Sequence, residues 1–396
     1  MTGSVVLVTL PPTRGGVPTK TGILARFLRR RGYDVDIAHY ATMSEFGDLS
    51  VPSWNLIRGK RPGVLQGTCF GDFPSTAVGC AFPELEFTYY RSSTNWRRAL
   101  EGYDRYIAVG GTVLVSNPLV ALDIPHMTWC ASTMIDDRID RRGAMPAPRR
   151  IFDAAVIGPV QRSMEKRILS RKTRFMTVSD YARRTLTAAG GDADRFMTVP
   201  VPVDRAVFSP PRTVSPGKIG FAGRADDPRK NIDLLLQAFR IVADRDPAVA
   251  LLLTGDASPG IRRRVGTLGI ENRVHWTGWL APSALSEFYR SLDVFVFPSR
   301  KEGLGIAGIE AMASGVPVVS TRCGGPEDFV LDGETGRLVN EDPAEMADAI
   351  TSIYTRRQVR DEMSRNAVAL ITERYSMETF EENISTNWKL TWGDTP

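Results

Sequence analysis

The sequence predicts an α/β protein built from two doubly wound, Rossmann-like domains that face an interdomain cleft. Its 396 residues are too many for one ordinary core and suit two domains of about 150–200 residues each. Short apolar runs alternate with helical stretches along the chain, which is the pattern of parallel sheets covered by helices. A proline-rich segment at 199–217 with few helix formers interrupts this alternation and indicates a linker.

The first half opens with an apolar strand at 4–10, which is followed by a loop rich in Pro and Gly. A helix ending at Gly32 then leads into a second strand at 33–38. Further apolar runs between helical stretches predict buried parallel strands at 104–109, 125–130, 174–178 and 196–200.

After the linker the alternation restarts, and the stretch 343–392 reads as helical throughout. We therefore expect an N-terminal domain at 1–204, a C-terminal domain at 205–375 and a final helix at 376–396 that packs back on the N-terminal domain. Ligands of open parallel sheets bind at the carboxyl ends of the strands, so the chemistry is expected there. The strands predicted in the second half are 218–223, 249–255, 273–278, 293–299 and 316–321.

The composition is that of an ordinary soluble globular protein, with 42% apolar and 24% charged residues. No apolar run approaches the length of about 18 residues that spans a bilayer, and the opening apolar stretch reads as a strand rather than a signal peptide. Four cysteines lie far apart without a C-x-x-C pair. The sequence therefore supports neither a zinc site nor a disulfide framework, and it favours a reduced, cytoplasmic compartment.

Positive charge is concentrated in one segment. Residues 136–184 contain 13 Lys or Arg against 6 Asp or Glu, in a chain whose net charge is +5. Three interpretations stay open for it: an exposed helix face, a patch that contacts a membrane surface, or a site for anionic ligands. Nucleic acid is not expected as a partner, because the basic residues are not interleaved with aromatics and no nucleic-acid-binding motif occurs.

The most conspicuous motif is a G-x-G-x-x-G formed by Gly303, Gly305 and Gly308. Such glycines between a strand and a helix usually indicate a dinucleotide site. Here the motif comes at the fourth strand–helix junction of its domain, no acidic residue ends the next strand, and a carboxylate at Glu302 precedes the turn. This context argues against a site for NAD or FAD. A P-loop at 14–21 is excluded as well, because Arg14 and Thr19 occupy its glycine positions.

The same glycines suit a different anionic ligand. They let the backbone approach closely, and the first free N–H groups of the following helix then point at an anion. Glu302 in the loop and Glu310 in the helix can each accept two hydroxyl hydrogen bonds, so one suits a sugar and the other a ribose. The alternative is that Glu310 is a solvated helix residue and Gly308 only packs against the sheet.

The stretch 302–339, EGLGIAGIEAMASGVPVVSTRCGGPEDFVLDGETGRLV, resembles the E-x7-E region of retaining glycosyltransferase family 4, whose enzymes have the GT-B fold. Its two glutamates eight apart, the glycine pair, A-M-A-S-G, P-V-V and G-G-x-x-D/E make the resemblance specific. Residues 221–239 resemble the G-R…K segment of the family, and 199–210 resemble its interdomain segment. The resemblance covers the second domain well and residues 1–125 thinly.

The resemblance implies that Arg224 and Lys230 hold the diphosphate of a nucleotide sugar. Two fixed cations can neutralise the charge that develops on this leaving group. It further implies that Glu302 contacts the donor sugar and that Glu310 contacts the ribose. Glu302, Arg224 and Lys230 are therefore the expected catalytic residues, and no metal site is expected.

Glycines are expected to bring backbone close to the donor from both domains. Gly15 and Gly16 follow the first strand of the N-terminal domain, and Arg14 beside them either reaches the phosphate or lies on the loop surface. Trp276 or Trp279 either stacks on the base or packs in the core. The backbone N–H groups expected to meet the phosphates belong to Gly303, Leu304 and Gly305.

The acceptor is expected in the N-terminal domain, at Trp129, Asp136, Asp137 and a loop over 69–95 rich in aromatic and small residues. Asp136 and Asp137 also fit a plain polar turn. Family members often have a histidine just after the strand near 125–131, but here His126 precedes the strand core. Either His126 is displaced in this register or the contact is missing.

The resemblance implies retaining transfer of a hexosyl group from a nucleoside diphosphate sugar, with UDP as the default nucleotide, to an acceptor hydroxyl on a small metabolite, glycan or lipid. No cofactor is expected beyond this co-substrate. The enzyme is expected in the cytoplasm, at the inner face of the membrane if the basic segment binds lipid. Two alternatives stay open: a nucleotide-sugar epimerase or phosphorylase on the same fold, and a non-catalytic nucleotide-sugar binder.

Overall fold

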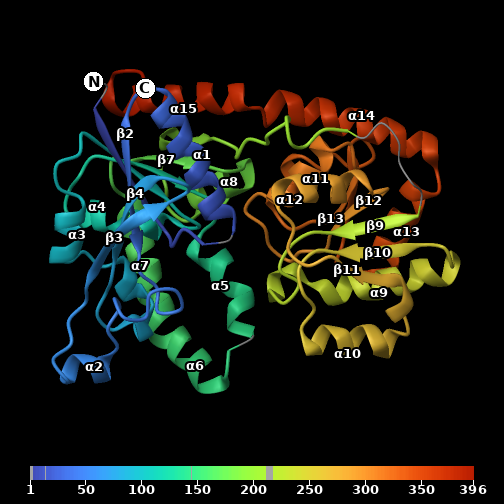
Figure 1. The fold of residues 1–396 in the computed structure, drawn as a ribbon, viewed down its shortest axis with the longest axis horizontal. Helices are drawn as coiled ribbons and strands as arrows, with labels where there is room; N and C mark the ends of the chain where they lie inside the picture. The colour runs from blue at the N-terminus through green and yellow to red at the C-terminus, as the bar shows by residue number, and fades with distance from the viewer. Residues whose placement is uncertain (1–2, 14, 144, 211–216) are drawn as a thin grey trace. The chain divides into compact units, whose positions relative to one another are not determined.

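The computed structural model describes residues 3–13, 15–143, 145–210 and 217–396. The chain divides into two compact units (Figure 1). Unit 1 holds the chain up to Val178 together with 182–199 and 381–396, and unit 2 holds 179–181 and 200–380.

Unit 1 is built on an eight-stranded sheet in the order β3-β4-β2-β1-β5-β6-β7-β8. All neighbouring strands run parallel except β3, which pairs antiparallel with β4. Central strands such as β1 and β6 are buried along almost their whole length, because helices cover both faces of a parallel sheet. The strands are β1 (Ser4–Thr9), β2 (Asp34–Tyr40), β3 (Val64–Cys69), β4 (Phe73–Val78), β5 (Arg105–Val109), β6 (Met127–Cys130), β7 (Arg174–Thr177) and β8 (Phe196–Thr198).

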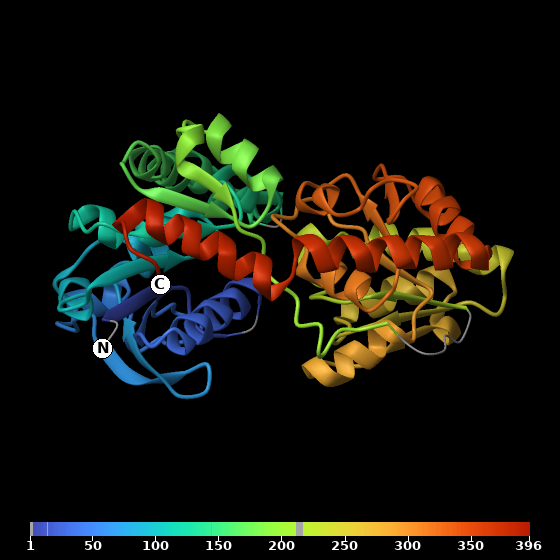
Figure 2. The same ribbon diagram turned by 90° about the horizontal axis from the view of Figure 1, so that it is seen from above.

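Helices lie on both faces of this sheet, and Figure 2 shows α1 and α8 on opposite sides of it. This placement follows from right-handed crossovers, because the strand order leaves β1 in one direction through α1 and runs in the other direction through α8. The α-helices are α1 (Gly16–Arg30), α2 (Ser53–Ile57), α3 (Thr94–Ala99), α4 (Asn117–Ala121), α5 (Met134–Gly143), α6 (Ala147–Phe152), α7 (Gly158–Leu169) and α8 (Asp180–Ala188).

The end of the chain belongs to unit 1. Helix α15 (Met377–Trp392) passes from unit 2 into unit 1, where Trp388 is fully buried. The Trp388 ring lies 5.1 Å from that of Tyr33, and Arg30 pairs with Glu381 at 2.9 Å. Aromatic burial therefore fixes the last helix to the turn between α1 and β2.

Unit 2 is built on a six-stranded, fully parallel sheet in the order β11-β10-β9-β12-β13-β14. One cluster of buried side chains packs α9 and α13 against the sheet, and Phe239 and Ile350 are fully buried members of it. The strands are β9 (Lys218–Phe221), β10 (Ala250–Leu253), β11 (Val274–Trp276), β12 (Val294–Phe297), β13 (Val318–Thr321) and β14 (Gly336–Val339). The α-helices are α9 (Ile232–Arg245), α10 (Pro259–Leu268), α11 (Pro282–Arg290), α12 (Ile306–Ala313), α13 (Pro343–Tyr354) and α14 (Arg357–Arg374).

The prediction of two doubly wound α/β sheets is confirmed, and some local predictions are wrong. The segment 69–95 is not a loop, because it contains β4 and two short 3-10 helices, η1 (Pro83–Leu85) and η2 (Phe87–Tyr90). The stretch 343–392, predicted to be helical, consists of three helices with short breaks at 355–356 and 375–376. Strands β3, β4 and β14 were not predicted, and 211–216 of the expected linker lie outside the described residues.

Candidate functional site

The strand order of unit 2 reverses between β9 and β12, and this reversal places two loops side by side at the carboxyl edge of the sheet. The loop after β9 carries Arg224 and Lys230, and the loop after β12 carries Glu302. The backbone N–H of Arg300 donates to the carbonyl of Arg229 at 2.8 Å and joins the two loops. The predicted donor residues of unit 2 therefore meet where ligands of this architecture bind.

Lys230 and Glu302 form an ion pair at this edge. The Lys230 Nζ donates to Glu302 Oε1 at 2.5 Å, and the Ser299 hydroxyl donates to the same oxygen at 3.1 Å. The two charged side chains are 18% and 16% exposed, and the ammonium lies 5.0 Å from the centre of the Phe297 ring. A cation that is fixed by an ion pair and largely shielded from water is suited to binding an anion.

Asp227 organises the other two cations of the β9 loop. Its side chain accepts the backbone N–H of Arg229 at 3.1 Å, which starts the short 3-10 helix η6 (Pro228–Lys230). The guanidinium groups of Arg229 and Arg224 pair with it at 2.8 and 3.1 Å. Burial raises the pKa of Asp227, but the hydrogen bonds and charge of Arg229, together with Arg224, outweigh it and lower that pKa to about 2.

Helix α12 begins at the same edge, and the loop directly before it carries backbone N–H groups that point to no partner within the described residues. Gly305 precedes the helix with φ 92°, a left-handed conformation that a glycine adopts without strain. A side chain there would also crowd Phe297 and Pro326, at 3.2 and 3.3 Å from its Cβ. Within the described part of the chain, the backbone N–H groups of Gly303, Leu304 and Gly305 have no hydrogen-bond partner. They and the helix dipole can therefore bind an anion.

Glu310 lies in the second turn of α12 and is partly exposed. Its Oε2 accepts a hydrogen bond from the hydroxyl of the fully buried Tyr289 at 3.0 Å. Burial raises the pKa of Glu310 to about 7, although the bond from Tyr289 acts in the opposite direction. The interpretation of Glu310 as a fully solvated helix residue is therefore wrong.

Trp279 is the better of the two tryptophans for stacking on a base. It is 49% exposed, and its ring comes within 4.0 Å of the Cβ position of Gly255, beside the carbonyl of Gly223. Trp276 instead packs against the hydrophobic core of unit 2. An exposed indole next to the β9 loop offers a flat apolar surface at the carboxyl edge.

In unit 1 the strand order reverses between β1 and β5. Gly15 and Gly16 lie at this reversal, where Gly15 precedes α1 with φ 135° and has no atom within 4 Å of its Cβ position. Among the described residues no atom therefore crowds the Gly15 backbone, and its approach to a donor stays a prediction. Arg14 lies outside the described residues.

The residues predicted to bind an acceptor are placed less favourably. Trp129 is completely buried in β6, and its indole N–H donates to the carbonyl of Val199 at 2.9 Å, so the prediction of an acceptor contact there is wrong. Asp136 accepts a hydrogen bond from the Thr133 hydroxyl at 3.1 Å and, like Asp137, lies in the first turn of α5. Both aspartates are engaged in further interactions and are not free carboxylates.

His126 is only 4% exposed and precedes β6. Its Nδ1 donates to the carbonyl of Ile124 at 2.6 Å. Burial lowers the pKa of His126 to about 4, although this hydrogen bond acts in the opposite direction. The ring is therefore neutral and held in the fold, on the amino side of the strand.

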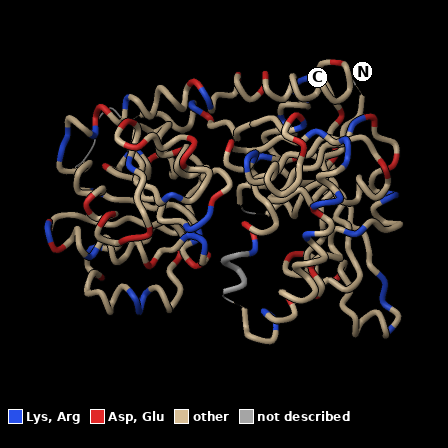
Figure 3. The backbone as a smooth tube through the Cα atoms, turned by 180° about the vertical axis from the view of Figure 1, so that it is seen from behind, with Lys and Arg blue, Asp and Glu red and all other residues tan. Residues whose placement is uncertain are grey.

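The charge of the basic segment 136–184 is partly neutralised inside unit 1. Arg149 pairs with Glu86 at 2.6 Å, and Arg138 pairs with Asp153. Figure 3 shows acidic and basic positions interspersed over both units, and the side chains of 139–144 are not described. No helix of the described residues combines the length and the apolar character that crossing a bilayer requires.

Sequence reasoning missed several residues that build these sites. Lys20, at 2% exposure, donates to the carbonyls of Gly110 at 2.8 Å and Trp129 at 3.1 Å, and so joins α1 to the loop after β5 and to strand β6 itself. Burial lowers the pKa of Lys20 to about 7. The other missed residues are Ser299, Asp227 and Tyr289.

Comparison with known proteins fits this geometry. The family described as glycosyl transferases group 1 matches residues 216–356. The D-inositol 3-phosphate glycosyltransferase of Arthrobacter sp. is 32% identical over 379 residues, covering 89% of this chain and 85% of that protein. The chain belongs to the group 1 glycosyltransferases, family 4, of the GT-B fold.

Some matches to this family are shorter. The D-inositol 3-phosphate glycosyltransferase of Nocardia farcinica is 33% identical over 53% of this chain, and the match spans only about half, 51%, of that protein. Among solved structures, a sucrose-phosphate synthase from Thermosynechococcus elongatus has a TM-score of 0.75 at 19% identity and covers 99% of both chains. HepE from Anabaena, solved with UDP and glucose, has a TM-score of 0.72 at 16% identity over 98% of this chain and all of HepE. These likenesses confirm the predicted fold of the family 4 chain.

Proposed function

We propose that this chain transfers a hexosyl group from a nucleoside diphosphate sugar to an acceptor hydroxyl, with retention of anomeric configuration. The observation that carries the proposal is the Lys230–Glu302 ion pair beside the N–H groups of Gly303, Leu304 and Gly305, which are unpaired among the described residues. In the reaction the bond between the anomeric carbon and the diphosphate oxygen breaks, and a bond from that carbon to the acceptor oxygen forms. The acceptor proton passes to the departing phosphate, so the products are a glycoside and a nucleoside diphosphate.

The donor is proposed to bind across the carboxyl edge of unit 2. Its diphosphate takes the ammonium of Lys230, the guanidinium of Arg224 and the N–H groups of Gly303, Leu304 and Gly305. Glu302, released from Lys230, accepts hydroxyls of the sugar. Glu310 accepts those of the ribose, and Trp279 contacts the base.

The charge of the leaving diphosphate is proposed to be neutralised by protein groups. Lys230 and Arg224 supply two positive charges where that charge develops, and the helix dipole of α12 adds to them. Among the described residues, no three His, Cys, Asp or Glu side chains are grouped as metal ligands. We therefore expect activity to persist in a chelator, a result that a resident divalent ion would prevent.

UDP is the proposed nucleotide, because a structural neighbour of this fold was solved with UDP-glucose. The acceptor class follows the names of the sequence relatives, which include D-inositol 3-phosphate glycosyltransferases and an α-(1→4)-mannosyltransferase. A polyol or a glycan is therefore the acceptor that we propose. From unit 1 we propose that Gly15 and Gly16 approach the donor and that Asp136 and Asp137 orient the acceptor.

A peripheral membrane contact is proposed at α6, within the basic segment. Ile151 and Phe152 are 69% and 38% exposed, and they follow the exposed cation Arg150. Apolar side chains next to a cation suit an interface with anionic lipids. This would place the enzyme at the inner face of a membrane.

A thermal-shift panel with UDP, GDP, ADP and NAD, run with a chelator on wild type and Arg224→Ala, tests the donor site. A ligand at 100 times its Kd stabilises the fold by roughly 2.7 kcal/mol. We expect a shift with one nucleoside diphosphate that shrinks in the variant. A shift with NAD alone would overturn the proposal.

Incubation of the enzyme with the donor sugar alone separates the competing functions. A transferase releases nucleoside diphosphate slowly without an acceptor and rapidly with one. Conversion of the donor into a second nucleotide sugar would instead show an epimerase. Binding without release under any condition would show a non-catalytic binder.

A further inference from the structure

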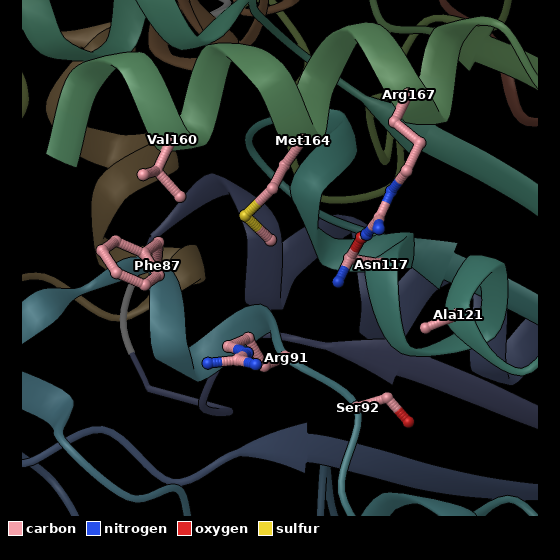
Figure 4. Close-up of a pocket in the computed structure, with 8 residues that line it drawn as sticks. All are labelled: Phe87, Arg91, Ser92, Asn117, Ala121, Val160, Met164 and Arg167. Atoms are coloured by element: carbon pink, nitrogen blue, oxygen red, sulfur yellow. The ribbon is translucent and has the colours of Figure 1, made fainter. Parts of the chain in front are cut away.

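Unit 1 contains a pocket of about 400 Å³ between η2, α4 and α7, apart from its glycine loops. Figure 4 shows Val160 and Met164 projecting into it from one helix, with Phe87 facing them. Arg91 and Arg167 lie on opposite sides of the same space (Figure 4). The volume is within the range of small-molecule sites, so the chemistry of its lining decides what it can hold.

The two guanidinium groups give the pocket an uncompensated positive charge. None of the eight residues that line it is acidic. Arg91 is exposed, and its side chain makes no hydrogen bond or ion pair with any residue that the structure describes. An arginine pair without a carboxylate favours a doubly charged anion, and phosphate oxygens match the planar fork of a guanidinium.

Arg167 is held in position by neutral groups. Its guanidinium donates to Asn117 Oδ1 at 2.6 Å, and the Asn117 amide in turn donates to the carbonyl of Tyr90 at 2.6 Å. This chain of hydrogen bonds fixes the side chain before any ligand arrives but leaves its charge unbalanced. A preorganised cation loses less conformational freedom on binding than a mobile one.

The apolar wall defines the rest of the ligand. Phe87, Val160 and Met164 are each partly exposed in this pocket and offer hydrocarbon surface next to the two cations. A bare phosphate would leave this surface in water, whereas an attached alkyl or ring group would cover it. We propose that this pocket is a second ligand site, separate from the donor loops of unit 2, for a phosphate monoester that carries an apolar group.

Isothermal titration calorimetry of the full chain with hexyl phosphate tests the site. We expect saturable binding by wild type, and weaker binding of both inorganic phosphate and hexanol, because each covers only half of the lining. Arg91→Glu should weaken hexyl phosphate at least tenfold or so, since it replaces a charge-assisted hydrogen bond by a repulsion. Equal affinity in wild type and Arg91→Glu would overturn the proposal, as would equal affinity for hexyl phosphate and inorganic phosphate.

Two control variants distinguish this pocket from the donor loops and from a general effect of surface charge. Arg97→Glu makes the same charge change at an exposed position of α3 and should leave binding unchanged. Lys230→Ala removes the proposed donor cation and should also leave it unchanged, so the second site stands even if the donor proposal fails. Loss of binding in Lys230→Ala together with normal binding in Arg91→Glu would assign hexyl phosphate to unit 2 and overturn the proposal. Unfolding of Arg91→Glu is not expected, because the side chain is exposed and makes no hydrogen bond or ion pair with the residues that the structure describes.

Vesicles identify the source of the phosphate. Sedimentation with phosphatidylcholine vesicles containing phosphatidic acid should fall in Arg91→Glu if the natural ligand is a lipid headgroup. If the ligand is a free metabolite, wild type and variant should sediment equally while their affinities for hexyl phosphate still differ. Either result supports the site and names its source.

Discussion

Helices α1 and α12 begin alike in their two units, and each carries one ionisable side chain in its second turn. Both follow a strand at the point where the strand order reverses, and both start after a glycine of positive φ, Gly15 or Gly305. In α1 the ionisable residue is Lys20, which is buried and donates to one loop carbonyl, that of Gly110, and to one strand carbonyl, that of Trp129. In α12 it is Glu310, which is partly exposed and accepts from Tyr289.

The difference separates a structural use of this geometry from the ligand-binding use that we propose for unit 2. Lys20 donates its hydrogen bonds to the carbonyls of Gly110 and Trp129, so it joins α1 to the loop after β5 and to strand β6 in unit 1. In the loop before α12, the N–H groups of Gly303, Leu304 and Gly305 are unpaired among the described residues. The Lys230–Glu302 ion pair lies at the same edge of the sheet. The same backbone start therefore gives a rigid scaffold in one unit and a polar site in the other.

Lys230→Ala should have the largest effect on the rate of the proposed reaction. The variant removes the best-held cation at the α12 edge, and loss of one preorganised group of this kind lowers turnover by roughly 100-fold or more. Initial rates of nucleoside diphosphate release at saturating acceptor measure it. Arg263→Ala, an exposed arginine of α10, is the matched control and should leave the rate unchanged. Normal rates in Lys230→Ala would remove Lys230 from the donor site.

Lys20→Met should have the largest effect on stability in unit 1. The carbonyls of Gly110 and Trp129 would lose their buried donor, at a cost of about 2 kcal/mol in the free energy of unfolding. Urea unfolding followed by circular dichroism measures the loss. Lys60→Met changes an exposed lysine and should cost almost nothing. An equal loss of unfolding free energy in both variants would show that the bonds from Lys20 to the carbonyls of Gly110 and Trp129 do not stabilise the fold.

The two ionisable residues should give pH dependences of opposite sign. The pKa of Lys20 falls from 10.5 to about 7, so the unfolded chain binds more protons in that window and stability rises with pH through it. The pKa of Glu310 rises from 4.5 to about 7, so stability falls as pH rises through that lower window. Each slope approaches on the order of 1 kcal/mol per pH unit.

Unfolding of wild type, Lys20→Met and Glu310→Gln between pH 5 and 9 separates these contributions. The difference between wild type and Lys20→Met should grow above pH 7, and the difference between wild type and Glu310→Gln should change mainly below it. Parallel curves for all three proteins would contradict both assignments.

The smallest expected effect concerns α6. Ile151→Asp should reduce sedimentation with anionic vesicles at low salt severalfold, because it removes exposed apolar surface beside Arg150. Asp substitution at Ile57, which is 88% exposed on α2, is the control for a general loss of surface hydrophobicity. Undetectable sedimentation of wild type would dismiss the membrane contact.

The sequence predicted those parts of the fold that have strong apolar periodicity. Buried strands such as β1 and β12 stand out as apolar runs, whereas every residue of β3 from Val64 to Thr68 is exposed and gives no such signal. β14 is only four residues long and includes Arg337, so it was overlooked. An edge strand held mainly by backbone pairing cannot be recognised from hydrophobicity.

The candidate site divides in the same way. Glu302, Arg224 and Lys230 were named from a motif, but their ion pairs were not, because Lys230 and Glu302 are 72 positions apart and only the strand order brings them together. Trp129 lies in an apolar run that predicts a buried strand, and that signal deserved more weight than its aromatic ring. The pairing of Glu310 with Tyr289 depends on how α11 packs against α12. The packing of two helices cannot be predicted from the pattern of a single sequence.

The Lys230–Glu302 pair also bears on how fast a bound product leaves. An anion that settles at α12 must take Lys230 from the carboxylate, which is already its partner at 2.5 Å. When that anion departs, Glu302 can pair with the ammonium again, so this largely buried cation is not left without a counter-charge. In the donor site that we propose, Glu302 thus competes with the diphosphate for Lys230, and a stronger Lys230–Glu302 pair would lower the affinity for the diphosphate.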